Sequence, residues 1–167
     1  MACREISQIF RDAGTTTREE NGTLHNVIAG QVVKKVQATA DNAAYIAPAL
    51  AEDNAATAYP YAFAMETNVA PAANGLYIPF NYKSNKDLVS CNLTKGALLE
   101  LWNDGTGAVF TADAAVAAAG TLLYVDANGI LTDTAGANAG TVGQVAVAEV
   151  VKPAADANGV LTVRTLI

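Results

Sequence analysis

Apolar residues alternate with polar or small residues along several short runs of this chain, a pattern that is typical of half-buried β-strands. Turn residues separate these runs, which cover residues 24–30, 31–39, 59–67, 75–84, 96–102, 121–125, 130–132, 142–151 and 160–167. Pro60 and Pro79 lack a backbone N–H, so the two runs that contain them are expected at sheet edges or in turns. Residues 41–57 are rich in alanine and weakly patterned, with Pro48 as a breaker. The pattern predicts a mainly β chain that folds as a small antiparallel β-barrel or sandwich-like module.

Tight turns are predicted where the sequence repeats itself. DANGILT begins at Asp126 and DANGVLT at Asp156, and a partial copy, AANGLYI, covers residues 72–78. Asn-Gly is favoured at the centre of a type I′ hairpin turn, where both residues need positive φ. The Asp-Ala-Asn-Gly turns lack the twelve-residue oxygen cage of a calcium loop, so we interpret them as structural turns.

Helix-like spacing occurs in two places. Ile6, Ile9, Phe10 and Ala13 fall on one face of a helix predicted over residues 4–13. So short a helix needs something to pack against, which is either its own domain or a partner. Residues 15–23 are polar and turn-rich, as in a linker. Residues 112–119 predict a second short helix, with Gly120 at its end.

These segments divide the chain into three parts. Residues 1–23 form an N-terminal arm with the short amphipathic helix. Residues 24–110 form a β-rich region. Residues 111–167 form a C-terminal β module, in which 142–151 is expected to be a central strand.

Composition limits the kind of surface that this fold can present. Hydrophobic residues make up 51% of the chain, but a large share of them is alanine, and each alanine buries little area. Small side chains suit closely spaced strands and flat contact surfaces better than a deep ligand pocket. Trp102 is the only tryptophan, and it is either a core anchor or an interface hot spot.

The charge of the chain argues against direct contact with nucleic acid. Ten Lys and Arg are scattered among sixteen Asp and Glu, for a net charge of −6. Nucleic-acid binding needs clustered cations for the phosphates. Arg4 and Glu5 stand where a signal peptide has its apolar run, and no segment is apolar for the length of a membrane span. We therefore expect a chain that is made in a cytoplasm and does not cross a membrane.

The residues that carry catalysis or bind metals are scarce. His25 is the only histidine, so a two-histidine metal site cannot form. Cys3 and Cys91 are far apart and are expected to be free thiols, and no phosphate-binding glycine motif is present. The sequence predicts no enzyme, no cofactor and no metal site.

The C-terminal segment holds a set of residues that belong together: Gly120, Leu123, Tyr124, Asn128, Gly129, Gly143, Ala146 and the final run 160–167. Through these residues it resembles the β module of capsid decoration (cement) proteins of tailed bacteriophages. The resemblance covers about the last 55 residues well and residues 24–40 weakly. It does not extend closely to residues 41–102, which we interpret as an insertion or a family-specific elaboration. It implies a β-tulip-type module that binds the outer surface of the capsid.

The resemblance also implies partners and a location. They are the major capsid protein and other copies of the chain, as a homotrimer or, as the alternative, a dimer. The chain would be made in the host bacterial cytoplasm and incorporated into the virion. On this interpretation the arm is the first candidate for the capsid contact. The candidate partner-binding residues are Arg4, Ile6, Ile9, Phe10, Arg11, Arg18 and Trp102.

Other kinds of surface protein remain alternatives. A head-fibre base or glycan-binding β module would hold sugar near Tyr59, Tyr61 and Tyr77, provided that these rings are exposed together. A bacterial adhesin or surface-layer domain is a further alternative, and the missing signal sequence counts against it.

Overall fold

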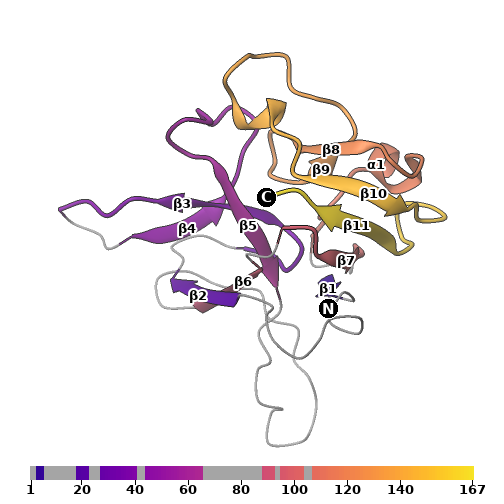
Figure 1. Cartoon of the computed structure of the whole chain (residues 1–167), viewed down its shortest axis with the longest axis horizontal. Coiled ribbons are helices and arrows are strands. Elements are labelled where there is room, and N and C mark those ends of the chain that lie inside the picture. The colour runs from indigo at the N-terminus through magenta and orange to yellow at the C-terminus, as the bar shows by residue number, and fades with distance from the viewer. Residues whose placement is uncertain are drawn as a thin grey trace, which may run out of the picture.

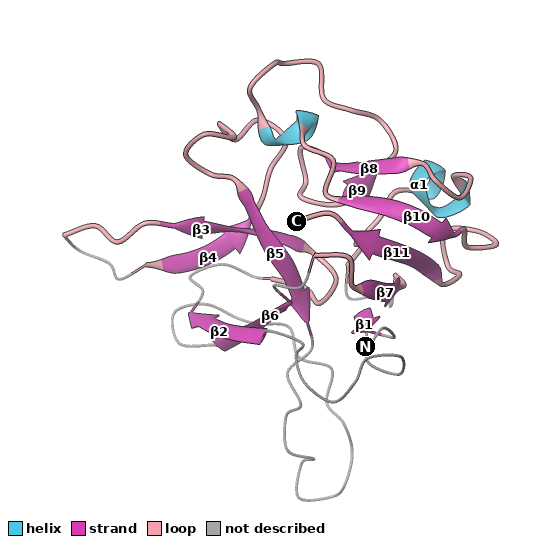
Figure 2. Cartoon of the chain, in the orientation of Figure 1, coloured by secondary structure: helices cyan, strands magenta, loops and turns pink. Residues whose placement is uncertain are grey.

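The computed structural model contains two antiparallel sheets that lie beside each other (Figure 1). It describes residues 3–5, 18–22, 27–40, 44–65, 88–92, 95–103 and 107–167. The six-stranded sheet has the order β1 (Cys3–Glu5), β7 (Leu98–Leu101), β11 (Leu161–Thr165), β10 (Ala148–Lys152), β8 (Leu122–Val125) and β9 (Leu131–Thr132). The five-stranded sheet has the order β2 (Arg18–Gly22), β6 (Leu88–Asn92), β5 (Pro60–Met65), β3 (Val32–Val36) and β4 (Tyr45–Pro48). Two short helical turns complete the described elements, α1 (Ala112–Val116) and η2 (Val142–Gln144) (Figure 2). The predicted mainly β, barrel- or sandwich-like fold is confirmed.

One hydrophobic core joins the two sheets. Leu99, Leu123 and Val163 of the six-stranded sheet and Phe63 of the five-stranded sheet belong to the same buried cluster. Successive residues of a strand point to opposite faces, so Leu99 is buried while its neighbours Leu98 and Glu100 are partly exposed. Alternation along the sequence therefore decides which face of each strand meets the other sheet.

The five-stranded sheet is curled, and its two edges approach each other because β2 contacts β4. The curl encloses a second, smaller buried cluster made of Val27, Val33, Ile46, Ala62 and Ala64. These residues alternate along the strands with members of the main core, such as Val32 beside Val33. Small side chains fit the inside of so tight a curve. The alanines of β5 thus have a packing role.

The predictions of a helix over residues 4–13 and of a linker over residues 15–23 are wrong in part. Cys3–Glu5 is strand β1, paired with β7 through Cys3 opposite Leu101 and Glu5 opposite Leu99, so residues 4 and 5 are not helical. Residues 6–13 of the predicted helix lie outside the described residues. The segment interpreted as a linker contains strand β2, which pairs along its whole length with β6. The local helical spacing does not decide the structure here, because pairing with distant strands satisfies backbone groups along the edges of β7 and β6.

The second predicted helix is confirmed but shorter. Helix α1 covers Ala112–Val116, and the Thr111 hydroxyl caps it by accepting the Ala114 N–H at 3.2 Å. Gly120 follows it in the left-handed region with φ 90°. Two residues, Ala118 and Ala119, therefore separate the Ala117 cap at the helix end from Gly120, which precedes β8.

The repeated turns form at the predicted places with a different geometry. Gly129 N–H donates to Asp126 O at 3.1 Å, so Ala127 and Asn128 are the central residues, and Asn-Gly does not occupy that position. Gly129 follows with φ 77°, the arrangement of a three-residue hairpin loop. The Asp126 carboxylate closes the turn by accepting the N–H groups of Asn128 and Ile130 at 2.8 and 3.0 Å. Asp156–Gly159 repeats the Asp-to-Gly bond, and the third, partial copy lies outside the described residues.

The sheets combine segments from all three predicted parts of the chain. The six-stranded sheet takes β1 from residues 1–23, β7 from 24–110 and its remaining strands from 111–167. Strands β10 and β11 lie inside this sheet, as predicted for residues 142–151, whose first part instead forms η2. Strand β4 lies in the alanine-rich segment that showed no clear pattern, and Pro48 ends it. Pro60 begins β5, where the absence of an N–H is tolerated although β5 lies inside its sheet.

Candidate functional site

The predicted partner-binding residues are divided between the two sheets. Arg4 lies on edge strand β1 opposite Glu100, and Arg18 lies on edge strand β2 opposite Asn92. Trp102 is half-buried and directly follows Leu101, which pairs with Cys3. Arg4 and Trp102 therefore lie at the same edge of the six-stranded sheet, whereas Arg18 belongs to the other sheet. Ile6, Ile9, Phe10 and Arg11 lie outside the described residues.

A second candidate surface is formed by residues 50–59 and 133–144, two loops that lie together in Figure 1 and that we call the apex. Backbone hydrogen bonds join the loops. Val142 N–H donates to Asp53 O at 2.8 Å, Gly143 N–H to Ala51 O at 3.0 Å, and Ala55 N–H to Gly140 O at 2.9 Å. The apex is thus held by the main chain, while small side chains such as Ala137 face the solvent.

Close packing inside the apex requires glycine. A Cβ at Gly143 would lie 3.0 Å from the Ala51 Cβ, and one at Gly136 would lie 3.2 Å from the backbone of Gly143. The small-residue loop after Asp133 is therefore not a loose connection. Its composition lets two stretches of backbone approach each other.

An ion pair anchors the apex to the five-stranded sheet. Lys34 Nζ on β3 lies 2.6 Å from Oδ1 and 2.7 Å from Oδ2 of Asp53. The same carboxylate accepts the Leu50 N–H at 2.7 Å. The two charged side chains are only 15% and 16% exposed. The Asp53 side chain therefore fixes the first apex loop to β3, and the Asp53 carbonyl oxygen accepts a hydrogen bond from the second apex loop.

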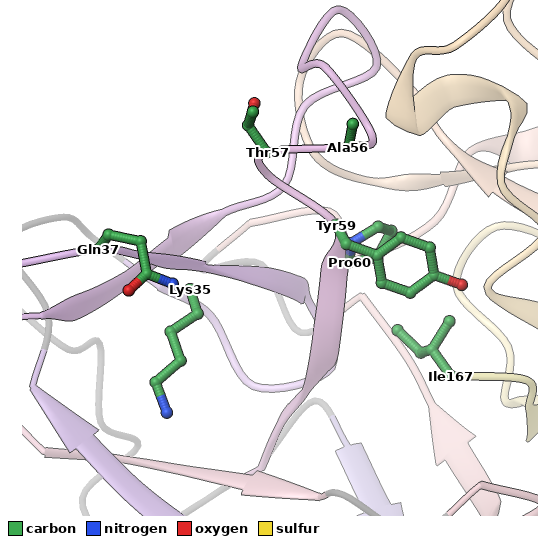
Figure 3. A pocket seen from close by; sticks show the side chains of 7 residues that line it. All are labelled: Lys35, Gln37, Ala56, Thr57, Tyr59, Pro60 and Ile167. Carbon is green, nitrogen blue, oxygen red and sulfur yellow. The ribbon is translucent and has the colours of Figure 1, made fainter.

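Beside the apex lies an open surface hollow of about 380 Å³ (Figure 3). Its lining residues come from the end of β3 and the segment after it, from the first apex loop with the start of β5, and from the last residue of the chain. They are Lys35, Gln37, Ala56, Thr57, Tyr59, Pro60 and Ile167. Tyr59, one of the tyrosines considered for sugar binding, is 56% exposed here. The Tyr61 side chain and all of Tyr77 lie outside what the structure describes, so no cluster of the three rings is observed.

Among the described residues, no group of three or more His, Cys, Asp or Glu side chains is placed to hold a metal ion. Within the same residues, no helix is long and apolar enough to cross a membrane. The Cys3 thiol is buried, and its Sγ lies 3.5 Å from Sδ of Met65. His25 falls outside the described part of the chain.

Two polar residues that the sequence did not single out hold the loops in place. Asp53 lies in the weakly patterned segment. Asn103, which lies just after β7, accepts the Val109 N–H through Oδ1 at 2.8 Å. Its Nδ2 donates to Ala157 O at 2.9 Å and to Phe110 O at 3.3 Å. No sequence motif marks either role, because each side chain binds segments distant along the chain.

No protein-family model matches this chain, and neither a curated protein nor a solved structure matches it.

Proposed function

We propose that this chain is a structural virion protein, which binds the outer surface of a tailed-phage capsid and stabilises contacts between major capsid subunits. The proposal draws on the resemblance of the last 55 residues to capsid decoration proteins. The residues that carry it have definite structural roles: Leu123 and Tyr124 lie on β8, Asn128 and Gly129 form its hairpin turn, and Gly143 packs in the apex. The final run supplies β11, inside the six-stranded sheet.

The observation that carries the proposal is the edge formed by β1. Within the described residues β1 has β7 as its one strand neighbour. The opposite edge of the same sheet is covered, because Leu131 N–H donates to Val109 O and Thr111 N–H donates to Leu131 O. An edge strand offers backbone groups to a partner protein. Arg4 on this strand and the half-buried Trp102 beside it add the residue types that are enriched at interface hot spots.

A stabilising role needs only modest affinity for each contact. Many copies bind one shell, and an oligomer engages several subunits at once, so weak contacts add up to stable attachment. We propose a homotrimer, with a dimer as the alternative. Light scattering on the purified chain measures this state directly.

Co-sedimentation with capsids assembled from the major capsid protein of the same virus tests the function. The full chain should bind saturably, and Arg4→Glu should weaken binding by tenfold or more, on the order of 1.4 kcal/mol. Arg164→Glu is the control, because Arg164 is an exposed arginine on β11, which β7 separates from the β1 edge. Saturable binding that survives Arg4→Glu would move the contact elsewhere on the chain. No binding by the folded, full-length chain would refute the capsid role.

A further inference from the structure

The hollow beside the apex has the size of a small-ligand site. Its volume of about 380 Å³ falls within the ~300–1,000 Å³ that is usual for ligand pockets. Its lining is mixed. Ala56, Pro60 and Ile167 are apolar, while Lys35, Gln37 and Thr57 bring an ammonium group, an amide and a hydroxyl (Figure 3). An open hollow of this kind suits a flat, polar ligand better than a fully apolar one.

Tyr59 supplies an aromatic surface to the hollow. At 56% exposure it contrasts with Phe63 and Phe110 in the described core, which are 0% and 1% exposed. Figure 3 shows its ring beside the Ile167 side chain, which lines the same hollow. A large ring left in water at a concave surface is the feature that a stacking ligand would use.

The chain holds Tyr59 in a restricted conformation. Pro60 follows it, and a residue before proline is limited to extended backbone conformations. On the other side, a turn fixes the preceding residues, because Ala58 and Thr57 donate their N–H groups to Asn54 O at 2.8 and 3.1 Å. The backbone of Tyr59 is therefore restricted before any ligand arrives, which lowers the entropy cost of binding.

Hydrogen-bonding groups lie around the ring. Within the described part of the chain, no hydrogen bond engages the Gln37 amide or the Tyr59 hydroxyl. The Thr57 hydroxyl makes one long contact, donating to Asn54 O at 3.4 Å. An amide and two hydroxyls both donate and accept hydrogen bonds, as the hydroxyls of a sugar do.

We propose that this hollow binds a neutral saccharide of one or two pyranose rings, stacked on Tyr59. The C–H face of a pyranose carries partial positive charge, which matches the negative face of the tyrosine ring. Gln37 and Thr57 hydrogen-bond the sugar hydroxyls at the rim. The site goes beyond the proposed capsid contact and does not rest on it. Figure 1 shows the start of β5, which lines the site, toward the apex and away from β1, so the two surfaces can be occupied together.

Saturation-transfer NMR on the full chain tests the site with cellobiose, maltose, lactose and diacetylchitobiose, each at up to about 10 mM. At least one of these should bind. Tyr59→Ala should weaken that binding by about fivefold to tenfold, whereas Tyr59→Phe should retain it within about threefold because the ring face remains. Gln37→Ala should produce a smaller loss.

Tyr124→Ala is the matched control, since it makes the same change on β8 of the other sheet. Its saccharide binding should equal that of the unmodified chain, and thermal denaturation shows that each variant is folded. Absence of binding by every probe overturns the proposal. Binding that Tyr59→Ala leaves unchanged also overturns it, because the sugar is then held elsewhere.

Discussion

The ion pair between Lys34 and Asp53 should be a main source of stability for the apex. Replacing Asp53 by alanine removes its bonds to Lys34 Nζ and to the Leu50 N–H, and leaves an ammonium group that is only 15% exposed. Loss of one partner of a fully buried pair costs about 3–5 kcal/mol. Because both side chains keep some contact with water, we expect Asp53→Ala to lower the free energy of unfolding by about 2–3 kcal/mol.

Lys34→Met separates the charge interaction from the packing of the side-chain stem. It retains the Leu50 bond to Asp53, so its expected cost is about 1–2 kcal/mol. Urea denaturation of both single variants and of the double variant gives the coupling energy, which we expect to be about 1–2 kcal/mol. In thermal denaturation, Asp53→Ala should lower Tm by about 5–10 °C for a chain of this length.

Amide hydrogen exchange shows whether the effect reaches the second loop. The N–H groups of Val142 and Gly143 donate to the carbonyl oxygens of Asp53 and Ala51, so both should exchange faster in Asp53→Ala. Two results together would refute the reasoning: single-variant effects that add within about 0.5 kcal/mol, and unchanged exchange at these amides.

Further predictions concern the turns, the loops and the curled sheet, each measured as a change in the free energy of unfolding in urea. Gly129 and Gly140 both have φ 77°. A Cβ at Gly129 would lie 3.1 Å from Ala49 O and 3.1 Å from Gln31 Nε2, whereas a Cβ at Gly140 would meet nothing within 4 Å. Gly140→Ala should therefore cost about 1 kcal/mol, and Gly129→Ala about 1–2 kcal/mol more. Asn103→Asp should cost about 2–3 kcal/mol, because the new carboxylate would face two carbonyl oxygens, while Arg164→Ala should cost under about 0.5 kcal/mol. Ala64→Leu should cost about 1–3 kcal/mol by overpacking the inside of the curled sheet.

Paired comparisons decide these predictions. Equal losses in the two glycine variants would show that the β8–β9 turn does not pack closely against Ala49 and Gln31. An Asn103→Asp loss no larger than that of Arg164→Ala would contradict the role of Asn103 in joining the loops. A neutral Ala64→Leu would mean that the curled sheet has free space inside.

Residue type and short-range pattern were enough to locate most strands. Alternation in 31–39 and 59–67 predicted β3 and β5, and the repeated Asp-Ala-Asn-Gly sequences marked turns that do form. These features are local, because side-chain direction alternates along any strand and the Asp carboxylate closes its own turn. The mainly β class follows from the same information.

Pairing over long distances decided the rest. Cys3–Glu5 is a strand because the edge of β7, almost a hundred residues later in the chain, offers backbone partners that outweigh a short local helical pattern. The roles of Asp53 and Asn103 and the hollow beside Tyr59 arise where distant segments meet. The sequence by itself determined which faces of the strands are apolar. The tertiary structure decided which segments those faces and their polar neighbours contact, because the spacing of apolar residues within one segment fixes neither the order of strands in a sheet nor the packing of loops.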